Sequence, residues 1–199
     1  MSQNVEIEFK NLLSEKEFYQ LQKVFQLTEA QFKIQTNYYF DTPNFVLKKH
    51  NAALRIREKN SSYELTLKEP LGQGLLETTD VLEKQIASSL IDGKQNLPMG
   101  DVHSQLDKYS IDLNELTCFG FLKTERAEID YQNGLLVFDK STYFEKEDFE
   151  LEYEVLDIDA GKKAFEELLK TYDIPIRPAD NKILRFYREK LRNEAKDSR

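Results

Sequence analysis

Three charged side chains near the N-terminus, Glu6, Glu8 and Lys10, alternate with the apolar residues Ile7 and Phe9. Successive side chains of a β-strand point to opposite faces, so the three charged groups are expected to share one face. Carboxylates on such a face can hold a divalent metal ion, and basic groups can hold phosphate oxygens. Taken alone, however, the pattern favours a strand that turns its charged face to water.

Four later segments also pair an apolar face with a charged one. Their charged positions, in chain order, are Arg55 and Arg57, then Lys68, then Arg126, then Glu150 and Glu152. Charges that face an enclosed space must be paired or must bind something. The forked guanidinium of arginine suits phosphate oxygens, and clustered carboxylates suit Mg²⁺ or Mn²⁺. The residues therefore favour a site for a polyphosphate anion together with a divalent metal ion.

The composition is that of a soluble globular protein, with 199 residues, 40% of them apolar and 32% charged. No run approaches the roughly 20 apolar residues that span a bilayer, and no secretory signal pattern is present. The single cysteine, Cys118, excludes an internal disulfide and a cysteine metal cluster. These features predict a cytoplasmic protein with no membrane partner. The net charge of −8 gives no general attraction to nucleic acid.

The elements that must position the charged residues follow from hydrophobic periodicity and turn signals. Strands are expected at residues 5–10, 31–40, 53–58, 63–68, 76–82, 116–131, 135–138 and 149–155. Helices are expected from the capping box at Ser14–Glu17, at 83–90, at 164–172, and after Asp180 as N-cap. Residues 45–51 are expected to be irregular. Residues 92–114 hold at most a short helix within 102–109 and are the best candidate for a flexible insertion.

This order of elements predicts an α+β class with a mainly antiparallel sheet and a single domain over residues 1–192. Residues 193–199 are expected to be a frayed tail. Eight strands are enough to close into a barrel that holds a small ligand, with the helices outside and the charged faces inside. An open sheet, whose charged face would meet water, remains the alternative.

The motifs, taken in order, resemble those of the CYTH superfamily, also called triphosphate tunnel metalloenzymes. Residues 6–10 match the E-x-E-x-K signature of that family. The later matches are residues 39–42, 54–57 and 65–68, then Arg126, Asp139 and residues 150–152. The resemblance runs from residue 5 to about 187. It is to the short bacterial single-domain members that are often labelled adenylate cyclases.

The resemblance implies an eight-stranded antiparallel barrel that forms a closed tunnel for a triphosphate. It implies metal binding by Glu6, Glu8, Asp139, Glu150 and Glu152. It implies phosphate binding by Lys10, Arg55, Arg57, Lys68 and Arg126, and, from the C-terminal helix, by Lys182 and Arg185. The expected catalytic set is Glu6, Glu8, Lys10, Glu150 and Glu152. Strand alternation turns Lys123 away from Arg126, so the role of Lys123 stays open, as does that of Glu154.

The function expected on these grounds is hydrolysis of inorganic tripolyphosphate or of a nucleoside or organic triphosphate, with Mg²⁺ or Mn²⁺ as cofactor. One alternative is an adenylate cyclase that converts ATP to cyclic AMP and pyrophosphate, although no adenine-specific motif is present. A second alternative is a non-catalytic module that binds polyphosphate or nucleotide, which would not need a metal cluster. The sequence leaves open the physiological triphosphate and the oligomeric state.

Overall fold

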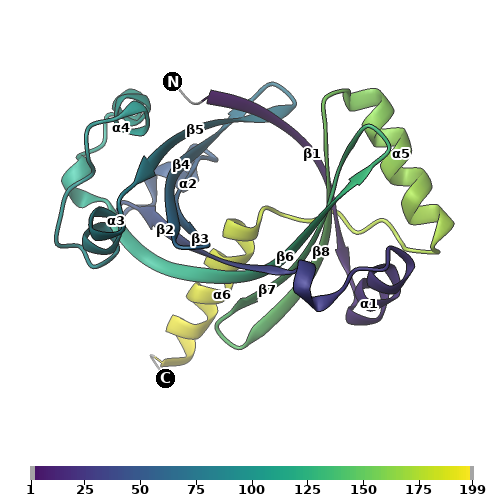
Figure 1. Cartoon of the computed structure of the whole chain (residues 1–199). Coiled ribbons are helices and arrows are strands. Elements are labelled where there is room, and N and C mark those ends of the chain that lie inside the picture. Colours follow the sequence, from purple (N-terminus) through teal and green to yellow (C-terminus); the bar gives the residue numbers. More distant parts are fainter. Residues whose placement is uncertain (1–2, 198–199) are drawn as a thin grey trace. The chain divides into compact units, whose positions relative to one another are not determined.

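The computed structural model describes residues 3–197 and contains eight strands (Figure 1). They are β1 (Gln3–Leu13), β2 (Lys33–Asp41), β3 (Ala53–Lys59), β4 (Ser62–Leu71), β5 (Gly74–Leu82), β6 (Thr117–Tyr131), β7 (Gly134–Tyr143) and β8 (Lys146–Val155). The hydrogen-bonded strand order β1-β5-β4-β3-β2-β6-β7-β8 closes into a barrel. The predicted α+β fold, with an eight-stranded closed antiparallel barrel, is confirmed.

The described residues also form six α-helices. They are α1 (Glu15–Val24), α2 (Val46–Lys49), α3 (Lys84–Ile91), α4 (Asp101–Leu106), α5 (Ile158–Thr171) and α6 (Lys182–Asp197), with short 3₁₀ turns at 29–31, 107–109 and 113–115. Within residues 3–197, none of the helices is long and apolar enough to cross a membrane.

Contacts within the chain fall into two compact units. The first unit is Met1–Glu6 with Gln35–Phe121, and the second is Ile7–Ile34 with Leu122–Arg199. Strands β1, β2 and β6 each have one end in each unit. The single domain expected over residues 1–192 stays a prediction.

The first unit is built on hairpins of β3, β4 and β5. Leu54 and Ile56 of β3 and Leu65 and Leu67 of β4 are almost completely buried in a core that also contains Leu106 of α4. Helices α3 and α4 supply the other side of this core. The alternate positions on β3 and β4 therefore point to the opposite face, as the alternation predicted.

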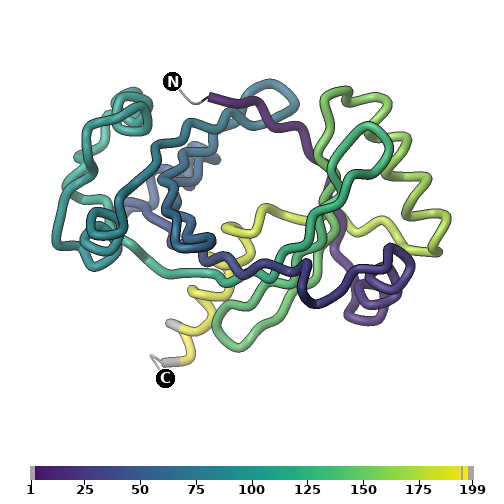
Figure 2. The backbone as a smooth tube through the Cα atoms, viewed as in Figure 1, coloured from purple at the N-terminus to yellow at the C-terminus, as the bar shows by residue number. Residues whose placement is uncertain are grey.

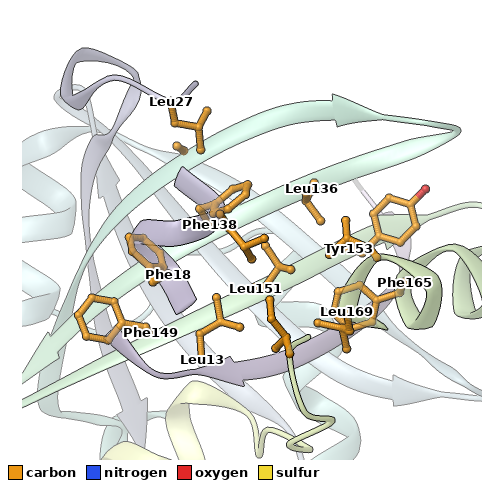
Figure 3. Close-up of a cluster of buried hydrophobic side chains, with 14 of the residues drawn as sticks. Leu13, Phe18, Leu27, Leu136, Phe138, Phe149, Leu151, Tyr153, Phe165 and Leu169 are labelled. Carbon is orange, nitrogen blue, oxygen red and sulfur yellow. The ribbon is translucent and has the colours of Figure 1, made fainter. Parts of the chain in front are cut away.

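The second unit places β1 beside β8, β8 beside β7 and β7 beside β6, and the chain trace shows the hairpins β6–β7 and β7–β8 (Figure 2). Its apolar face packs against α1 and α5 (Figure 1). Phe18 of α1 and Phe165 of α5 belong to one buried cluster with Phe138 and Leu151 of the sheet (Figure 3). Helix α5 approaches β8 so closely that a Cβ on Gly161 would lie 2.5 Å from the Val155 side chain. This packing leaves the other face of β7 and β8 to polar residues.

Helix α1 begins as the sequence predicted. Ser14 and Glu17 form a complete capping box at its N-terminus, and Phe18 and Leu21 are buried beneath it. The cap fixes the point at which the chain leaves β1.

Residues 45–51, expected to be irregular, contain helix α2. The Asp41 carboxylate accepts hydrogen bonds from the backbone N–H groups of Thr42 (2.8 Å), Leu47 (3.0 Å) and Lys48 (3.0 Å). A four-residue helix is too short to show a hydrophobic period, and a side chain five residues upstream of it satisfies its first N–H groups.

Residues 92–114 are packed into the first unit rather than forming a free insertion. The predicted short helix is present as α4, where Val102 and Leu106 are fully buried. The Asp80 carboxylate on β5 accepts hydrogen bonds from the N–H groups of Asp101 (3.1 Å) and Val102 (2.9 Å). These contacts anchor the segment to the sheet.

The last helix differs from the prediction at both ends. It begins at Lys182, so Asp180 lies before the cap position and is not the N-cap. It also continues to Asp197, so the expected fraying is wrong for residues 193–197, while 198–199 lie outside the described residues. Residues 194–196 are Glu, Ala and Lys, which favour helix, and no Gly or Pro interrupts them.

Candidate functional site

Three carboxylates gather on the face of β7 and β8 that points away from the apolar core. Asp139, Glu150 and Glu152 are 0%, 1% and 4% exposed. Their strand neighbours Phe138 and Leu151 lie in the core, so alternation accounts for the opposite direction of the acids. Buried carboxylates are costly unless they are paired or hold a cation.

Lys182, the first residue of α6, supplies one such cation. Its Nζ lies 2.7 Å from Asp139 Oδ2 and 2.7 Å from Glu150 Oε2, and it also contacts Glu152. Burial alone would lower the pKa of this amine, but the charges of Asp139, Glu152 and Glu150 raise the pKa well above its ordinary value. Lys182 is therefore a permanent positive charge among three acids.

Arg126 on β6 supplies a second cation. Its guanidinium forms a fork with Asp139 at 2.7 and 2.6 Å and reaches Glu152 at 2.8 Å. Burial would raise the pKa of Asp139 and of Glu152, but the charges of Arg126 and Lys182 hold both below the usual range. Both carboxylates are consequently ionised at neutral pH.

The N-terminal motif contributes Glu8 and Lys10 to the same face of the second unit. Lys10 Nζ lies 2.5 Å from Glu8 Oε1 and 3.3 Å from Asn181 Oδ1, and Lys10 is directly opposite Glu152 in the β1–β8 register. Burial opposes the charge of Lys10, yet Glu8 and Glu152 raise its pKa overall. Residues about 140 positions apart thus form one charged cluster.

Arg185, one turn beyond Lys182 on α6, faces acids as well. Its Nη2 lies 2.7 Å from Glu150 Oε2 and its Nε lies 3.0 Å from Asp148 Oδ2. We refer to these residues together as the second-unit cluster: Glu8, Lys10, Arg126, Asp139, Asp148, Glu150, Glu152, Lys182 and Arg185.

A smaller charged group lies within the first unit. Lys68 Nζ is 2.5 Å from Glu6 Oε2 and also contacts Glu77 on β5. Burial would raise the pKa of Glu77, but Lys68 and Arg55 lower it to about 2. Arg57 Nε donates to Asn37 Oδ1 at 3.1 Å. These residues form the first-unit cluster.

Arg55 differs from the other basic residues of the first-unit cluster. Its Nε is buried and, within the described part of the chain, has no hydrogen-bond acceptor. A buried donor without a partner costs free energy, so this N–H is well suited to receive an acceptor from a ligand.

The chemistry of the carboxylates fits a hard divalent ion, because Mg²⁺ and Mn²⁺ prefer oxygen ligands. Among residues 3–197, no three His, Cys, Asp or Glu side chains are arranged as they stand to hold a metal ion. The oxygens of Asp139, Glu150 and Glu152 converge instead on Lys182 and Arg126. These acids therefore suit a divalent metal ion in type and number. For the ion to bind, Lys182 and Arg126 would have to move away from the carboxylate oxygens.

The structure groups the predicted residues by unit. Glu8, Lys10, Arg126, Asp139, Glu150, Glu152, Lys182 and Arg185 lie in the second unit, and Glu6, Arg55, Arg57 and Lys68 lie in the first. Lys123 is exposed, as the alternation predicted, and Glu154 acts on Arg126 through its charge. The residues that the sequence did not indicate are Glu77, Asp148 and Tyr143. Glu77 belongs to a strand with weak alternation, and Asp148 stands within a run of charges that suggested a solvated turn.

The sequence profile described as CYTH domain matches residues 4–187. The chain belongs to the CYTH domain family. This CYTH chain is 49% identical over 193 residues to "Putative triphosphatase YjbK" of Bacillus subtilis (strain 168), covering 97% of this chain and 100% of that protein.

Two solved structures resemble this CYTH chain over nearly its whole length. A "putative adenylate cyclase" from Bacillus halodurans is 42% identical, with a TM-score of 0.90 and coverage of 94% of this chain and 100% of that one. HpAC1 from Hippeastrum is 23% identical, with a TM-score of 0.79 and coverage of 93% and 95%, and it shares the fold.

Proposed function

We propose that this CYTH protein hydrolyses a triphosphate with the help of a divalent metal ion. The substrate would be inorganic tripolyphosphate or a nucleoside or organic triphosphate. The name of the YjbK relative, at 49% identity over the whole of that protein, supports a triphosphatase. The observation that carries the proposal is the second-unit cluster, where buried acids and buried bases share one face.

The basic residues would bind and orient the phosphate chain. Lys10, Arg126 and Lys182 of the second unit and Arg55, Arg57 and Lys68 of the first are assigned this task. Phosphoryl transfer depends mainly on positioning and on stabilising charge in the transition state, which fixed cations provide. The free Nε of Arg55 supports this assignment, because a phosphate oxygen would satisfy it.

The acidic residues would hold the metal. Glu8, Asp139, Glu150 and Glu152, together with Glu6, are assigned to Mg²⁺ or Mn²⁺. A bound ion of this kind lowers the pKa of its water and neutralises phosphate charge. The ionised state of Asp139 and Glu152, which Arg126 and Lys182 enforce, keeps these oxygens ready to act as ligands.

The test is a phosphate-release assay on tripolyphosphate, ATP, thiamine triphosphate and longer polyphosphate, each with Mg²⁺, Mn²⁺ or EDTA. We expect release from at least one triphosphate in a metal arm and none with EDTA. Glu8→Ala and Glu152→Ala should abolish release while remaining folded by circular dichroism. Glu166→Ala, on the exposed face of α5, is the matched control. Full activity in either of the first two variants would refute the metal assignment.

Cyclisation of ATP is the second candidate, because the relative from Bacillus halodurans is described as a "putative adenylate cyclase". Product analysis after incubation with ATP and Mn²⁺ separates the two reactions. Cyclic AMP with pyrophosphate would support cyclisation, whereas ADP with orthophosphate would support hydrolysis. Thermal stabilisation by tripolyphosphate without any phosphate release would instead favour a binding module.

A further inference from the structure

A row of polar side chains leads along β7 and β8 to the Glu150 carboxylate. The Tyr143 hydroxyl donates to Asp148 Oδ2, and the same oxygen accepts from Arg185 Nε at 3.0 Å. Arg185 in turn binds Glu150 through Nη2 at 2.7 Å and through Nη1 at 3.4 Å. Tyr143, Asp148 and Glu150 lie on one face, since Ser141 faces Asp148 and Asp139 faces Glu150 in the strand register.

Arg185 has little hydrogen-bonding capacity left for a ligand. Its Nη1 also donates to the Asp180 carbonyl oxygen at 2.6 Å. Four of its five N–H groups therefore have acceptors within the protein. Arg55, whose buried Nε has none among the described residues, is in the opposite situation.

Burial makes this row costly to break. The side chains of Glu150 and Arg185 are 1% and 10% exposed. Burial lowers the pKa of the Arg185 guanidinium, but the hydrogen bond to Glu150 and the charge of Asp148 raise the pKa above its ordinary value. Burial, and the bond to Asp148, raise the pKa of Tyr143, so its hydroxyl keeps the proton that it donates. The direction of each hydrogen bond is therefore set, because Tyr143 and Arg185 donate and the two carboxylates accept.

We propose that Tyr143, Asp148 and Arg185 are positioning residues that fix the orientation of the Glu150 carboxylate. This inference rests on the proposed function, in which Glu150 is a metal ligand. It also gives Arg185 a task other than the phosphate binding that the family resemblance implied. The carboxylate of a metal ligand is typically held by hydrogen bonds from residues behind it, and losing such a partner typically lowers metal affinity 10- to 100-fold.

Phosphate binding and positioning predict different kinetics. If Arg185 bound the phosphate chain, its loss would raise KM for the triphosphate at saturating metal. If it holds Glu150, the loss weakens metal binding, and KM at saturating metal stays near the wild-type value. The Arg185→Lys substitution separates the two cases again, because it keeps the positive charge but cannot bridge Asp148 and Glu150 with a planar fork.

The experiment compares Tyr143→Phe, Asp148→Asn and Arg185→Lys with the wild-type full-length chain. Tyr109→Phe is the matched control, since the Tyr109 hydroxyl donates to the Glu69 carboxylate in the first unit. Mn²⁺ affinity is measured by titration calorimetry without substrate. KM and kcat for the triphosphate that the wild type hydrolyses are then measured at saturating Mn²⁺.

We expect about a tenfold weaker Mn²⁺ affinity in each of the three variants, an unchanged KM, and wild-type affinity in Tyr109→Phe. Tyr143→Phe removes only the hydroxyl oxygen, so this variant should fold and still tests the inference if Arg185→Lys does not fold. Wild-type Mn²⁺ affinity in Tyr143→Phe and Asp148→Asn would overturn the inference while leaving the proposed function intact. An Arg185→Lys variant with raised KM and unchanged Mn²⁺ affinity would overturn it as well. Absence of Mn²⁺ binding by the wild type would overturn the inference, and absence of metal-dependent phosphate release as well would overturn the proposed function.

Discussion

Lys182 is the central cation of the second-unit cluster. Its ammonium group contacts three carboxylates, Asp139, Glu150 and Glu152, whose own exposure is close to zero. A metal ion at these oxygens would have the same charge sign and would compete for the same ligands. Lys182 therefore acts as an internal counter-ion, which a metal ion bound at these oxygens would have to displace.

This role predicts a metal-dependent stability effect. Removing the ammonium in Lys182→Met leaves an excess of buried negative charge, which should cost about 3–5 kcal/mol of unfolding free energy in EDTA. Saturating Mn²⁺ should restore most of that loss, because the ion neutralises the same oxygens. Urea unfolding followed by circular dichroism measures both values.

Lys162→Met serves as the control, because Lys162 is largely exposed on α5 and should change stability by less than about 0.5 kcal/mol. A Lys182→Met protein whose stability is the same with Mn²⁺ and with EDTA would contradict the counter-ion role.

At the scale of elements, one ion pair ties α1 to the segment that precedes α6. Arg177 forms a fork with Glu17 at 2.7 and 2.9 Å, and the Ser14 N–H also donates to Glu17 at 2.7 Å. The hydrogen bond from Arg177, with that from Ser14, lowers the pKa of Glu17 from 4.5 to about 2. We call this Arg177–Glu17 ion pair the clamp, and it connects two segments 160 residues apart in the sequence.

The clamp predicts acid-dependent stability. A pKa lowered in the folded state contributes stability that is complete above pH 4.5 and is lost as the pH falls towards 2. Because Arg177 is partly exposed, solvent screening limits the contribution to about 1 kcal/mol. Glu17→Gln should therefore be less stable than wild type at pH 7, and the difference should shrink below pH 4. Urea unfolding at a series of pH values measures it, and a difference that grows in acid would refute the clamp.

Local signals predicted most of the elements. The Ser14 capping box, the alternation around Leu54 and Leu65 and the helical period of α5 each depend on neighbours in sequence, so they can be read directly. Helix α2 could not be predicted in this way, because the group that caps it is the Asp41 carboxylate at the end of the preceding strand. The start of α6 was misplaced because Asp180, a good cap residue, lies just before the true one.

For the whole molecule, the proposed function predicts stabilisation by ligands. A ligand that binds only the folded state, present at 100 times its Kd, adds about 2.7 kcal/mol, or roughly 5–10 °C in Tm for a chain of this size. Tripolyphosphate with Mn²⁺ should give such a shift in scanning fluorimetry. Tripolyphosphate with EDTA should give a smaller one, since the acids would then repel the phosphate. Equal shifts in the two arms would argue against metal-assisted binding.

The sequence predicted which strand face each charged residue of the candidate site occupies, but it did not predict which residues pair with one another. Alternation placed Lys10, Arg126 and Glu152 on polar faces, and the order of motifs suggested that they belong together. The partners could not be predicted, because strand register decides them and register depends on the whole fold. Glu6 meets Lys68, and Asp148 meets Arg185, only after elements distant in sequence have packed, whereas Lys68 and Glu77 face each other within one hairpin.

The pairing of β1 has a consequence for how the chain is made. Residues Ile7–Leu13 of β1 pair with residues Phe149–Val155 of β8. At a synthesis rate of about 5–20 residues per second, the roughly 140 residues between them take about 7–30 s to emerge from the ribosome. During that interval this backbone edge of β1 has no hydrogen-bonding partner, and Phe9 and Leu13 lack the core side chains of β8 and α5 that pack with them in the folded protein.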